Sequence, residues 1–273
     1  VLRTAAAGWL EQLPGRKPAT AMSQQDGAPP AARPWDGLYG PNELAIWGAG
    51  GYGARAGVGQ RPAVLIIDPV RAFCGYPGEE HLASVSRFRQ SCGPYAWQAI
   101  PHIQRLLAAG RARGFPVIYT RASILPPELR GARRRKNSRV GKESGETAVE
   151  GHEYPDEIAP LPGELIIEKT KPSVFFGTPL FSHLQMYGVD HLLVAGTTTS
   201  GCVRASVYDA FSLNFSITIP YECVFDRFIT SHRVNLFDMN SKFADVISLE
   251  ELLAQLDEAF PLAAGSVPAG ARS

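Results

Sequence analysis

Three residues with chemically active side chains each follow a run of apolar residues in this sequence. They are Asp68 after Ala63–Ile67, Lys169 after Leu165–Ile167, and Cys202 after His191–Ala195. A thiol can serve as a nucleophile, a carboxylate can accept its proton, and an ammonium group stabilises nearby negative charge. Together these residue types are consistent with nucleophilic catalysis by the cysteine.

Each of the three also has a purely structural interpretation. A cysteine often behaves as a small buried hydrophobe, Asp68 could cap a turn, and Lys169 could be a solvated lysine where a strand ends. Cys202, however, opens a helix predicted for Val203–Leu213. The N-terminus of a helix offers free N–H groups and a positive dipole end, so we expect a lowered pKa for this thiol and a place for an oxyanion.

The elements that must position these residues are short apolar runs separated by amphipathic segments. The predicted strands are Ala63–Ile67, Pro116–Tyr119, Leu165–Ile167, His191–Ala195, Ser216–Ile219 and Ala244–Ile247. The predicted helices are Ala96–Arg113, Pro179–Tyr187, Val203–Leu213 and Arg233–Phe243. Strands that are apolar throughout are typical of sheets covered on both faces. The pattern predicts an α/β fold: a three-layer, doubly wound, Rossmann-like and mostly parallel sheet of about six strands with helices on both faces.

Ligands of such sheets bind beyond the carboxyl ends of the strands. Asp68, Lys169, the segment Thr197–Cys202 and the pair Asp226–Arg227 all lie at or just after a predicted strand end. We therefore expect them to share one site. The alternative for Asp226–Arg227 is a surface ion pair.

Composition excludes some partners. The net charge of +1 gives no general attraction to nucleic acid. No apolar run approaches the roughly 20 residues of a membrane span, so we expect no membrane partner either. The four cysteines form no CxxC pair, which favours a reducing, cytoplasmic setting.

The motifs taken together resemble the isochorismatase-like cysteine hydrolases. Three of them carry the resemblance: Asp68 with Phe73 after an apolar strand, Lys169 before Phe175-Phe-Gly-Thr, and Thr198-Thr-Ser-Gly-Cys-Val-Arg204. The resemblance runs from about Tyr39 to Leu256 and implies that Asp68, Lys169 and Cys202 form a catalytic triad. True isochorismatases lack this cysteine, so its presence points to amide hydrolysis.

A narrower resemblance, to the N-carbamoylsarcosine amidase and maleamate amidase branch, implies further roles. The backbone N–H groups of Thr198 and Cys202 would form an oxyanion hole, next to a cis peptide bond between Thr197 and Thr198. Arg227 would hold a substrate carboxylate, because its planar fork binds carboxylates bidentately. The other substrate-binding residues expected are Phe73, Phe175, Thr197 and Arg204.

The chain is therefore expected to be a cysteine-dependent amidohydrolase that releases ammonia from a small linear amide or carbamoyl compound through a thioester. The substrate is expected to bear a carboxylate, as N-carbamoylsarcosine does. Maleamate or a ureide or biuret-type compound is the alternative substrate, and a non-catalytic binding protein of the same fold is the alternative of another class. The family usually forms dimers or tetramers, so we expect a homo-oligomer.

We expect neither a metal nor another cofactor. The nicotinamidase branch binds a metal through histidines after the second strand, and the corresponding segment 119–126 has none. The pattern GxGxxG at 48–53 precedes the first strand, whereas a dinucleotide motif must follow one.

Composition divides the chain into three parts. Residues 1–35 are predicted to be a disordered tail, 36–258 the isochorismatase-like hydrolase domain, and 259–273 a flexible tail. The basic stretch 121–164 is interpreted as a solvated insert, and a nucleic-acid patch there is the less favoured alternative.

Overall fold

The computed structural model describes residues 32–124 and 146–262, and its centre is a parallel sheet. The strands are β1 (Pro62–Ile67), β2 (Val117–Ala122), β3 (Leu165–Lys169), β4 (His191–Thr197), β5 (Ser216–Pro220), β6 (Val224–Phe225) and β7 (Asp245–Ile247). Six follow the order β3-β2-β1-β4-β5-β7, and β6 pairs with the end of β4. Because every pair is parallel, the carboxyl ends of all strands point to one edge.

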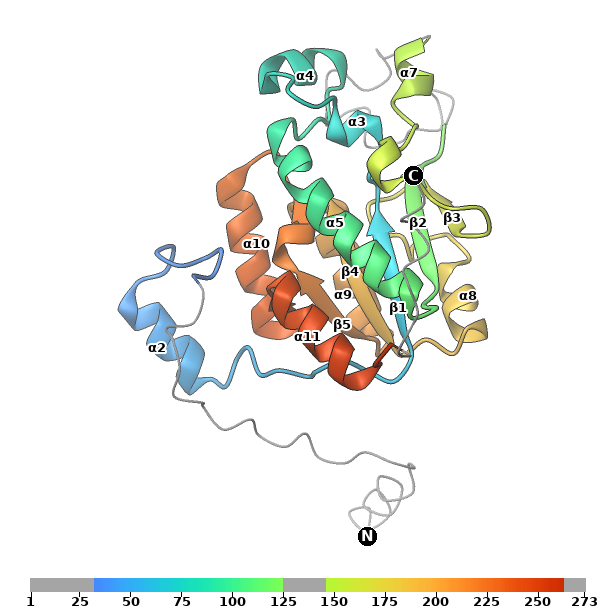
Figure 1. The fold of residues 1–273 in the computed structure, drawn as a ribbon. Helices are drawn as coiled ribbons and strands as arrows, with labels where there is room; N and C mark the ends of the chain where they lie inside the picture. The colour runs from blue at the N-terminus through green and yellow to red at the C-terminus, as the bar shows by residue number, and fades with distance from the viewer. Residues whose placement is uncertain (1–31, 125–145, 263–273) are drawn as a thin grey trace. The chain divides into compact units, whose positions relative to one another are not determined.

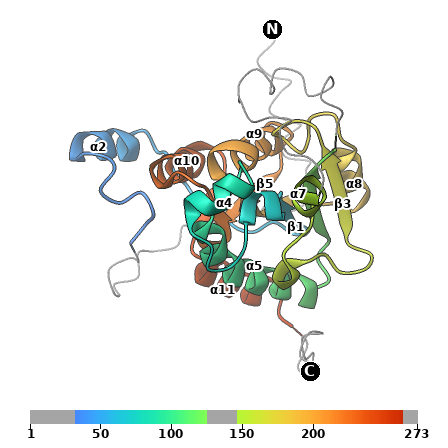
Figure 2. The same cartoon turned by 90° about the horizontal axis from the view of Figure 1, so that it is seen from above.

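Helices cover both faces of this sheet (Figures 1 and 2). One face carries α5 (Pro94–Ala112) and α11 (Leu249–Ala259). The other carries α8 (Leu180–Met186), α9 (Arg204–Ser212) and α10 (Ile229–Lys242). The remaining helical segments are α2 (Pro41–Ala49), α3 (Arg71–Cys74), α4 (His81–Arg87), α7 (Glu146–Glu150), η2 (Asp156–Ile158), η3 (Thr199–Val203) and η4 (Tyr221–Cys223).

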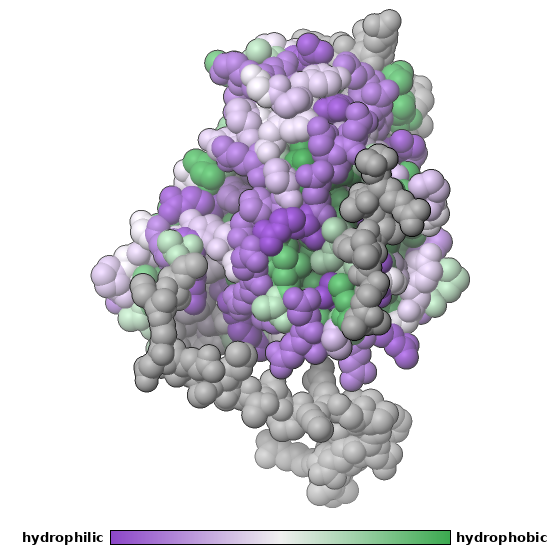
Figure 3. Space-filling view, viewed as in Figure 1, coloured by the Kyte–Doolittle hydropathy of each residue, from purple (hydrophilic) through white to green (hydrophobic). Residues whose placement is uncertain are grey.

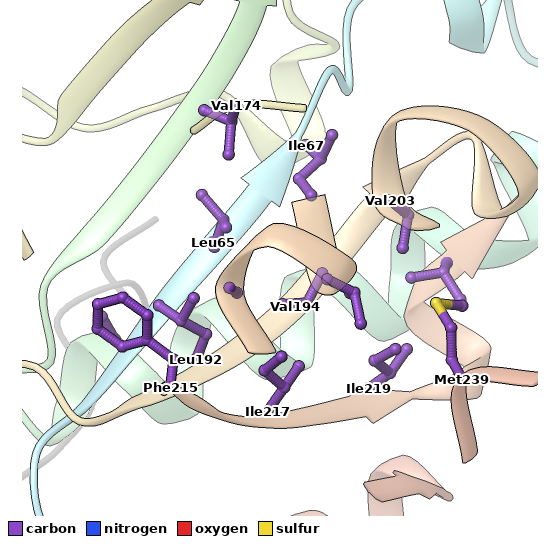
Figure 4. Close-up of a cluster of buried hydrophobic side chains, with 14 of the residues drawn as sticks. Leu65, Ile67, Val174, Leu192, Val194, Val203, Phe215, Ile217, Ile219 and Met239 are labelled. Carbon is purple, nitrogen blue, oxygen red and sulfur yellow. The ribbon is translucent and has the colours of Figure 1, made fainter. Parts of the chain in front are cut away.

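Alternating side chains of the strands divide the core into two clusters. Along β1, Leu65 and Ile67 point to the side of α8, α9 and α10, whereas Val64 and Ile66 point to the side of α5 and α11. Figure 4 shows the first cluster, in which Leu65 and Ile67 lie with Val194 and Val203. With both faces buried, the central strands are apolar at nearly every position, which is the pattern that the sequence carries.

The predicted fold class is confirmed. All six predicted strands and all four predicted helices form, with ends shifted by a few residues. The seventh strand, β6, is only Val224–Phe225, too short to give a hydrophobic pattern of its own.

The ordered structure begins before residue 36, the predicted start of the domain. Trp35 is buried and its ring lies 6.0 Å from that of Phe237. Residues 1–31 of the predicted N-terminal tail, the basic residues of the 121–164 insert from Arg130 to Lys142, and residues 263–273 lie outside the described residues.

The face of the molecule that carries α5 is polar around small apolar patches. Figure 3 shows the side that carries α5, where hydrophilic residues dominate and hydrophobic ones appear in separate groups. Among the described helices, none is long and apolar enough to cross a membrane.

Candidate active site

The site begins where β1 ends. Asp68 adopts a φ of 50°, in the left-handed region that Asp tolerates better than most residues and that recurs at functional sites. Its backbone N–H donates to Oγ1 of Thr120 at 3.0 Å, and the same hydroxyl donates to Oδ1 of Asp68 at 2.7 Å. Thr120, on the neighbouring strand β2, therefore fixes both the backbone and the carboxylate of Asp68.

The neighbouring strand β4 approaches β1 closely at this edge. Gly196 has a φ of 101°, and a Cβ added there would lie 2.1 Å from the carbonyl oxygen of Ile67. Only glycine fits such a contact. The peptide bond between Thr197 and Thr198 is cis, as the resemblance implies. Residues 198–203, here called the Cys202 turn, follow directly and return the chain to α9 through a π-helical turn.

Lys169, the last residue of β3, joins the two strand ends. Its Nζ lies 2.7 Å from Oδ2 of Asp68 and 3.3 Å from Sγ of Cys202, and it donates to the carbonyl of Lys171 at 3.2 Å. An ammonium group has three protons, so these acceptors use all of them. Burial lowers the pKa of Lys169, but the interactions with Asp68 and Cys202 outweigh it and the pKa is raised overall. This lysine is therefore a fixed cation between a carboxylate and a thiol.

The environment of Cys202 contradicts the expected low pKa of the thiol. Burial and the neighbouring Asp68 carboxylate raise the pKa to about 12, and Lys169 only partly opposes them. Cys202 also lies inside the turn that precedes α9, so it is not the first residue of the α-helix. At neutral pH the resting group is a partly exposed, protonated thiol with a carboxylate and an ammonium group beside it.

A second cation lies beyond β6. Arg227 donates from Nη2 to the carbonyl of Gln90 at 2.6 Å, while its Nε is buried without a hydrogen-bond partner. Its backbone N–H donates to Oδ1 of Asp226 at 2.8 Å. The side chain of Asp226 is fully buried, which contradicts the surface ion pair considered for Asp226–Arg227.

The other residues expected to bind substrate have different surroundings. Arg204 is half exposed and bonds to Asn235 at 2.6 Å, so it ties α9 to α10. Phe175 contacts Phe215 at 6.0 Å between ring centroids, next to the amino end of β5. Both side chains have a contact within the fold, and their expected roles in substrate binding stay predictions.

Two further expected residues are buried. Phe73, in α3, is a core side chain. The hydroxyl of Thr197 donates to the carbonyl of Phe225 at 3.1 Å, so this donor serves the pairing of β4 with β6.

Sequence reasoning missed three residues that support the site. Two of them are Thr120 and His232, whose Nδ1 lies 2.8 Å from Oγ1 of Thr199. The third is Asp226, which the sequence placed at the site but not as a buried carboxylate that holds Ser200. Thr120 carried a weak signal, since it is a polar residue in an otherwise apolar strand. Within residues 32–124 and 146–262, no cluster of His, Cys, Asp and Glu could hold a metal ion.

The arrangement places a thiol, a carboxylate and an ammonium group in one contact group at the carboxyl edge of the sheet. Such a group can transfer a proton from sulfur to oxygen without the help of solvent, and the cation stabilises either anion. This is the chemistry that nucleophilic attack on a carbonyl carbon needs.

Comparison with known proteins identifies the fold and its lineage. Residues 62–251 match the family described as the Isochorismatase domain. The chain belongs to the isochorismatase family. That confirms the resemblance stated from the three motifs, and the family match spans all three residues of the contact group.

Two characterised relatives in this family are hydrolases of small amides by name. The maleamate amidohydrolase of Pseudomonas putida is 34% identical over 211 residues, covering 76% of this chain and 92% of the relative. The N-carbamoylsarcosine amidase of an Arthrobacter species is 35% identical over 227 residues, covering 82% and 81%. These are the two activities of the expected branch.

Solved structures agree on the fold. A cysteine hydrolase from Pseudomonas syringae pv. phaseolicola superposes with a TM-score of 0.65 at 20% identity, covering 76% of this chain and 97% of that one. An isochorismatase family protein from Desulfovibrio vulgaris gives a TM-score of 0.62 at 26% identity, covering 72% and 99%.

Proposed function

We propose that the protein is a cysteine-dependent amidohydrolase that releases ammonia from a small linear amide or carbamoyl compound bearing a carboxylate. The observation that carries this proposal is the position of Lys169 Nζ, within hydrogen-bonding reach of both Asp68 and Cys202. The amidase and amidohydrolase relatives support the same reaction class.

In the proposed reaction, Asp68 accepts the proton of the Cys202 thiol as the sulfur attacks the amide carbon. The thiol is protonated at rest because its pKa is about 12, so the reaction needs this base. Lys169 first neutralises the carboxylate and then the thiolate, without moving between them. A covalent intermediate divides one difficult hydrolysis into two easier steps.

The oxygen of the attacked carbonyl becomes negatively charged and is proposed to accept hydrogen bonds from the backbone N–H groups of Thr198 and Cys202. Asp68 then gives its proton to the leaving nitrogen, the carbon–nitrogen bond breaks, and ammonia departs from a thioester on Cys202. A water molecule, deprotonated by Asp68, attacks the thioester and releases the acid and the thiol. No step calls on a cofactor.

Arg227 is proposed to bind the substrate carboxylate. Its Nε–H and one N–H of Nη2 can bind the two oxygens of a carboxylate side by side. The other N–H of Nη2 donates to the carbonyl oxygen of Gln90. The buried Nε has no hydrogen-bond partner in the protein, and a buried donor left unpaired is costly, which supports an acceptor on the substrate at this fork. The fork matches the geometry of a carboxylate.

Two further properties stay predictions. A homo-oligomer is expected from the family, as a dimer or tetramer. A cytoplasmic, reducing setting is supported by the free state of Cys74, Cys92, Cys202 and Cys223.

Ammonia release tests the reaction. Wild-type protein should release ammonia from N-carbamoylsarcosine or maleamate faster than from the neutral compounds biuret and nicotinamide. Cys202→Ser should abolish release and leave the thermal unfolding midpoint nearly unchanged, while the control Cys223→Ser, at a buried cysteine in η4, should retain it. Retained turnover by Cys202→Ser would refute the proposal, and inactivity of the wild type toward all four compounds would favour the binding-protein alternative.

A matched pair of arginine variants tests carboxylate recognition. Arg227→Ala should raise KM for the anionic substrate by roughly 10- to 150-fold, because hydrogen bonds to charged groups contribute about 1.5–3 kcal/mol. The control Arg105→Ala, at an exposed ion pair with Glu250, should leave KM unchanged. Equal KM values for wild type and Arg227→Ala would remove Arg227 from the binding site.

A further inference from the structure

Asp226 is a buried carboxylate outside the contact group of Asp68, Lys169 and Cys202. It follows β6 directly, and β6 pairs with the last two residues of β4, Gly196 and Thr197. Its side chain has no exposed surface. A buried carboxylate is stable only where several donors replace its hydration, so its donors indicate what it holds in place.

Those donors come from two sides. Oδ2 accepts from the backbone N–H of Ser200 at 2.9 Å and from the hydroxyl of Ser200 at 2.6 Å. Oδ1 accepts from the backbone N–H of Arg227 at 2.8 Å, and the guanidinium Nη1 lies 4.0 Å away. One carboxylate thus connects the Cys202 turn with the proposed carboxylate-binding arginine.

The position of Ser200 makes this connection relevant to catalysis. Ser200 lies between Thr198 and Cys202, the two residues proposed to form the oxyanion hole. Fixing its peptide N–H fixes the middle of the Cys202 turn. A second residue of the segment after β6, His232, contacts Thr199 at 2.8 Å, so adjacent residues of the turn are held from the same side.

We propose that Asp226 is a positioning residue that holds the Cys202 turn in its reactive conformation and sets Arg227 relative to it. This inference rests on the proposed function, since it assigns the turn an oxyanion-binding role. Asp226 touches no reacting atom. It acts through Ser200 on one side and Arg227 on the other.

Asp226→Asn tests the proposal with a side chain of the same shape. In an amide one oxygen is replaced by an NH2 group, which only donates, so the backbone N–H of either Ser200 or Arg227 must face a donor instead of an acceptor. The reaction should be followed with maleamate and with maleamide, the neutral diamide. Maleamide has no carboxylate for Arg227, so its kcat reports on the Cys202 turn alone.

We expect Asp226→Asn to lower kcat for both compounds by about 10- to 100-fold, because a displacement of about 1 Å costs on that order. Arg227→Ala, in contrast, should affect KM for maleamate and spare kcat for maleamide. Ser200→Ala, which removes only the hydroxyl contact, should lower kcat for both by a smaller factor, about 2- to 10-fold. The matched control Asp257→Asn changes a carboxylate on α11 that pairs with Arg113, and its kcat should match that of the wild type.

Hydrogen exchange gives a readout that does not depend on the substrate. Amides of residues 198–203 should exchange at least about tenfold faster in Asp226→Asn than in the wild type, while those of β1 should not change. A folded Asp226→Asn protein with wild-type kcat for maleamide and wild-type exchange would overturn the proposal. If that variant does not fold, wild-type exchange and kcat in Ser200→Ala would overturn it. If wild-type protein hydrolyses neither compound, maleamate is not its substrate, and exchange still decides the role of Asp226.

Discussion

Replacing Lys169 by Met removes the cation from the centre of the site and leaves Asp68 buried without its ionic partner. The two groups are 2.7 Å apart, and their side chains are only 4% and 2% exposed. At that distance and an effective dielectric constant of 20, their attraction is about 6 kcal/mol, which offsets the cost of burying both charges. Breaking such a pair from one side typically costs about 3–5 kcal/mol, because the remaining charge is uncompensated.

We therefore expect Lys169→Met to lower the free energy of unfolding by about 3–5 kcal/mol. For a domain of this size that corresponds to a decrease in Tm of roughly 6–20 °C. Urea titration followed by circular dichroism measures the first quantity and thermal melting the second. Lys171→Met removes an exposed lysine two residues away and should stay within about 0.5 kcal/mol of the wild type.

The double variant Asp68→Asn/Lys169→Met makes the test specific. It has no unpaired buried charge, so it should be more stable than Lys169→Met, with a coupling energy of about 2 kcal/mol. The raised pKa of Lys169 sets the pH range in which the ion pair stabilises the fold. Its contribution to the free energy of unfolding is complete below the ordinary pKa of 10.5 and is lost as pH rises through the higher folded-state pKa. A loss below about 1 kcal/mol in Lys169→Met, or additive effects in the double variant, would refute the ion pair.

Two further predictions follow from shifted pKa values. Because the pKa of Cys202 is about 12, its alkylation by iodoacetamide should accelerate about tenfold per pH unit from pH 7 to 9.5. Cys92 has a similar pKa but is fully buried, so its alkylation should be slower. Mass spectrometry measures both rates, and a rate for Cys202 that no longer rises above pH 7 would contradict the raised pKa. Burial lowers the pKa of His191 from 6.5 to about 4, so stability is complete above pH 6.5 and about 3 kcal/mol should be lost as pH falls to 4. Urea titrations at several pH values should show that the free energy of unfolding falls less steeply with falling pH in His191→Asn than in the wild type. Equal pH dependence of the two proteins would argue against the lowered pKa of His191.

The sequence predicted well those elements whose pattern depends on the burial of several consecutive residues. A strand such as β1 is apolar at every position because helices cover both faces, and this pattern needs no tertiary information to be recognised. The convergence of Asp68, Lys169 and Cys202 follows from the same topology, since parallel strands bring their carboxyl ends to one edge. The position of each residue at a strand end was therefore enough to predict one shared site, and the family resemblance implied that the three residues form a triad.

Side-chain direction and desolvation were harder to predict. Arg204 is two residues beyond Cys202, but Cys202 lies in the π-helical turn and Arg204 in α9, so their spacing in the sequence does not give the angle between the two side chains. The pKa of Cys202 depended on a competition between burial, which raises it, and nearby positive charge, which lowers it. The sequence displayed the helix start but not how much protein surrounds the sulfur.

The high pKa of Cys202 and its proposed role as nucleophile agree once the destination of the proton is considered. A pKa of about 12 describes the loss of the proton to solvent, which leaves two anions beside one cation. In the proposed reaction the proton moves to Asp68 instead. The group then changes from carboxylate, ammonium and thiol to carboxylic acid, ammonium and thiolate, and its net charge is zero in both states. Because Lys169 lies 2.7 Å from the carboxylate and 3.3 Å from the sulfur, the same cation stabilises either anion. The thiolate therefore needs to form only when a substrate carbon is in place to take the new bond.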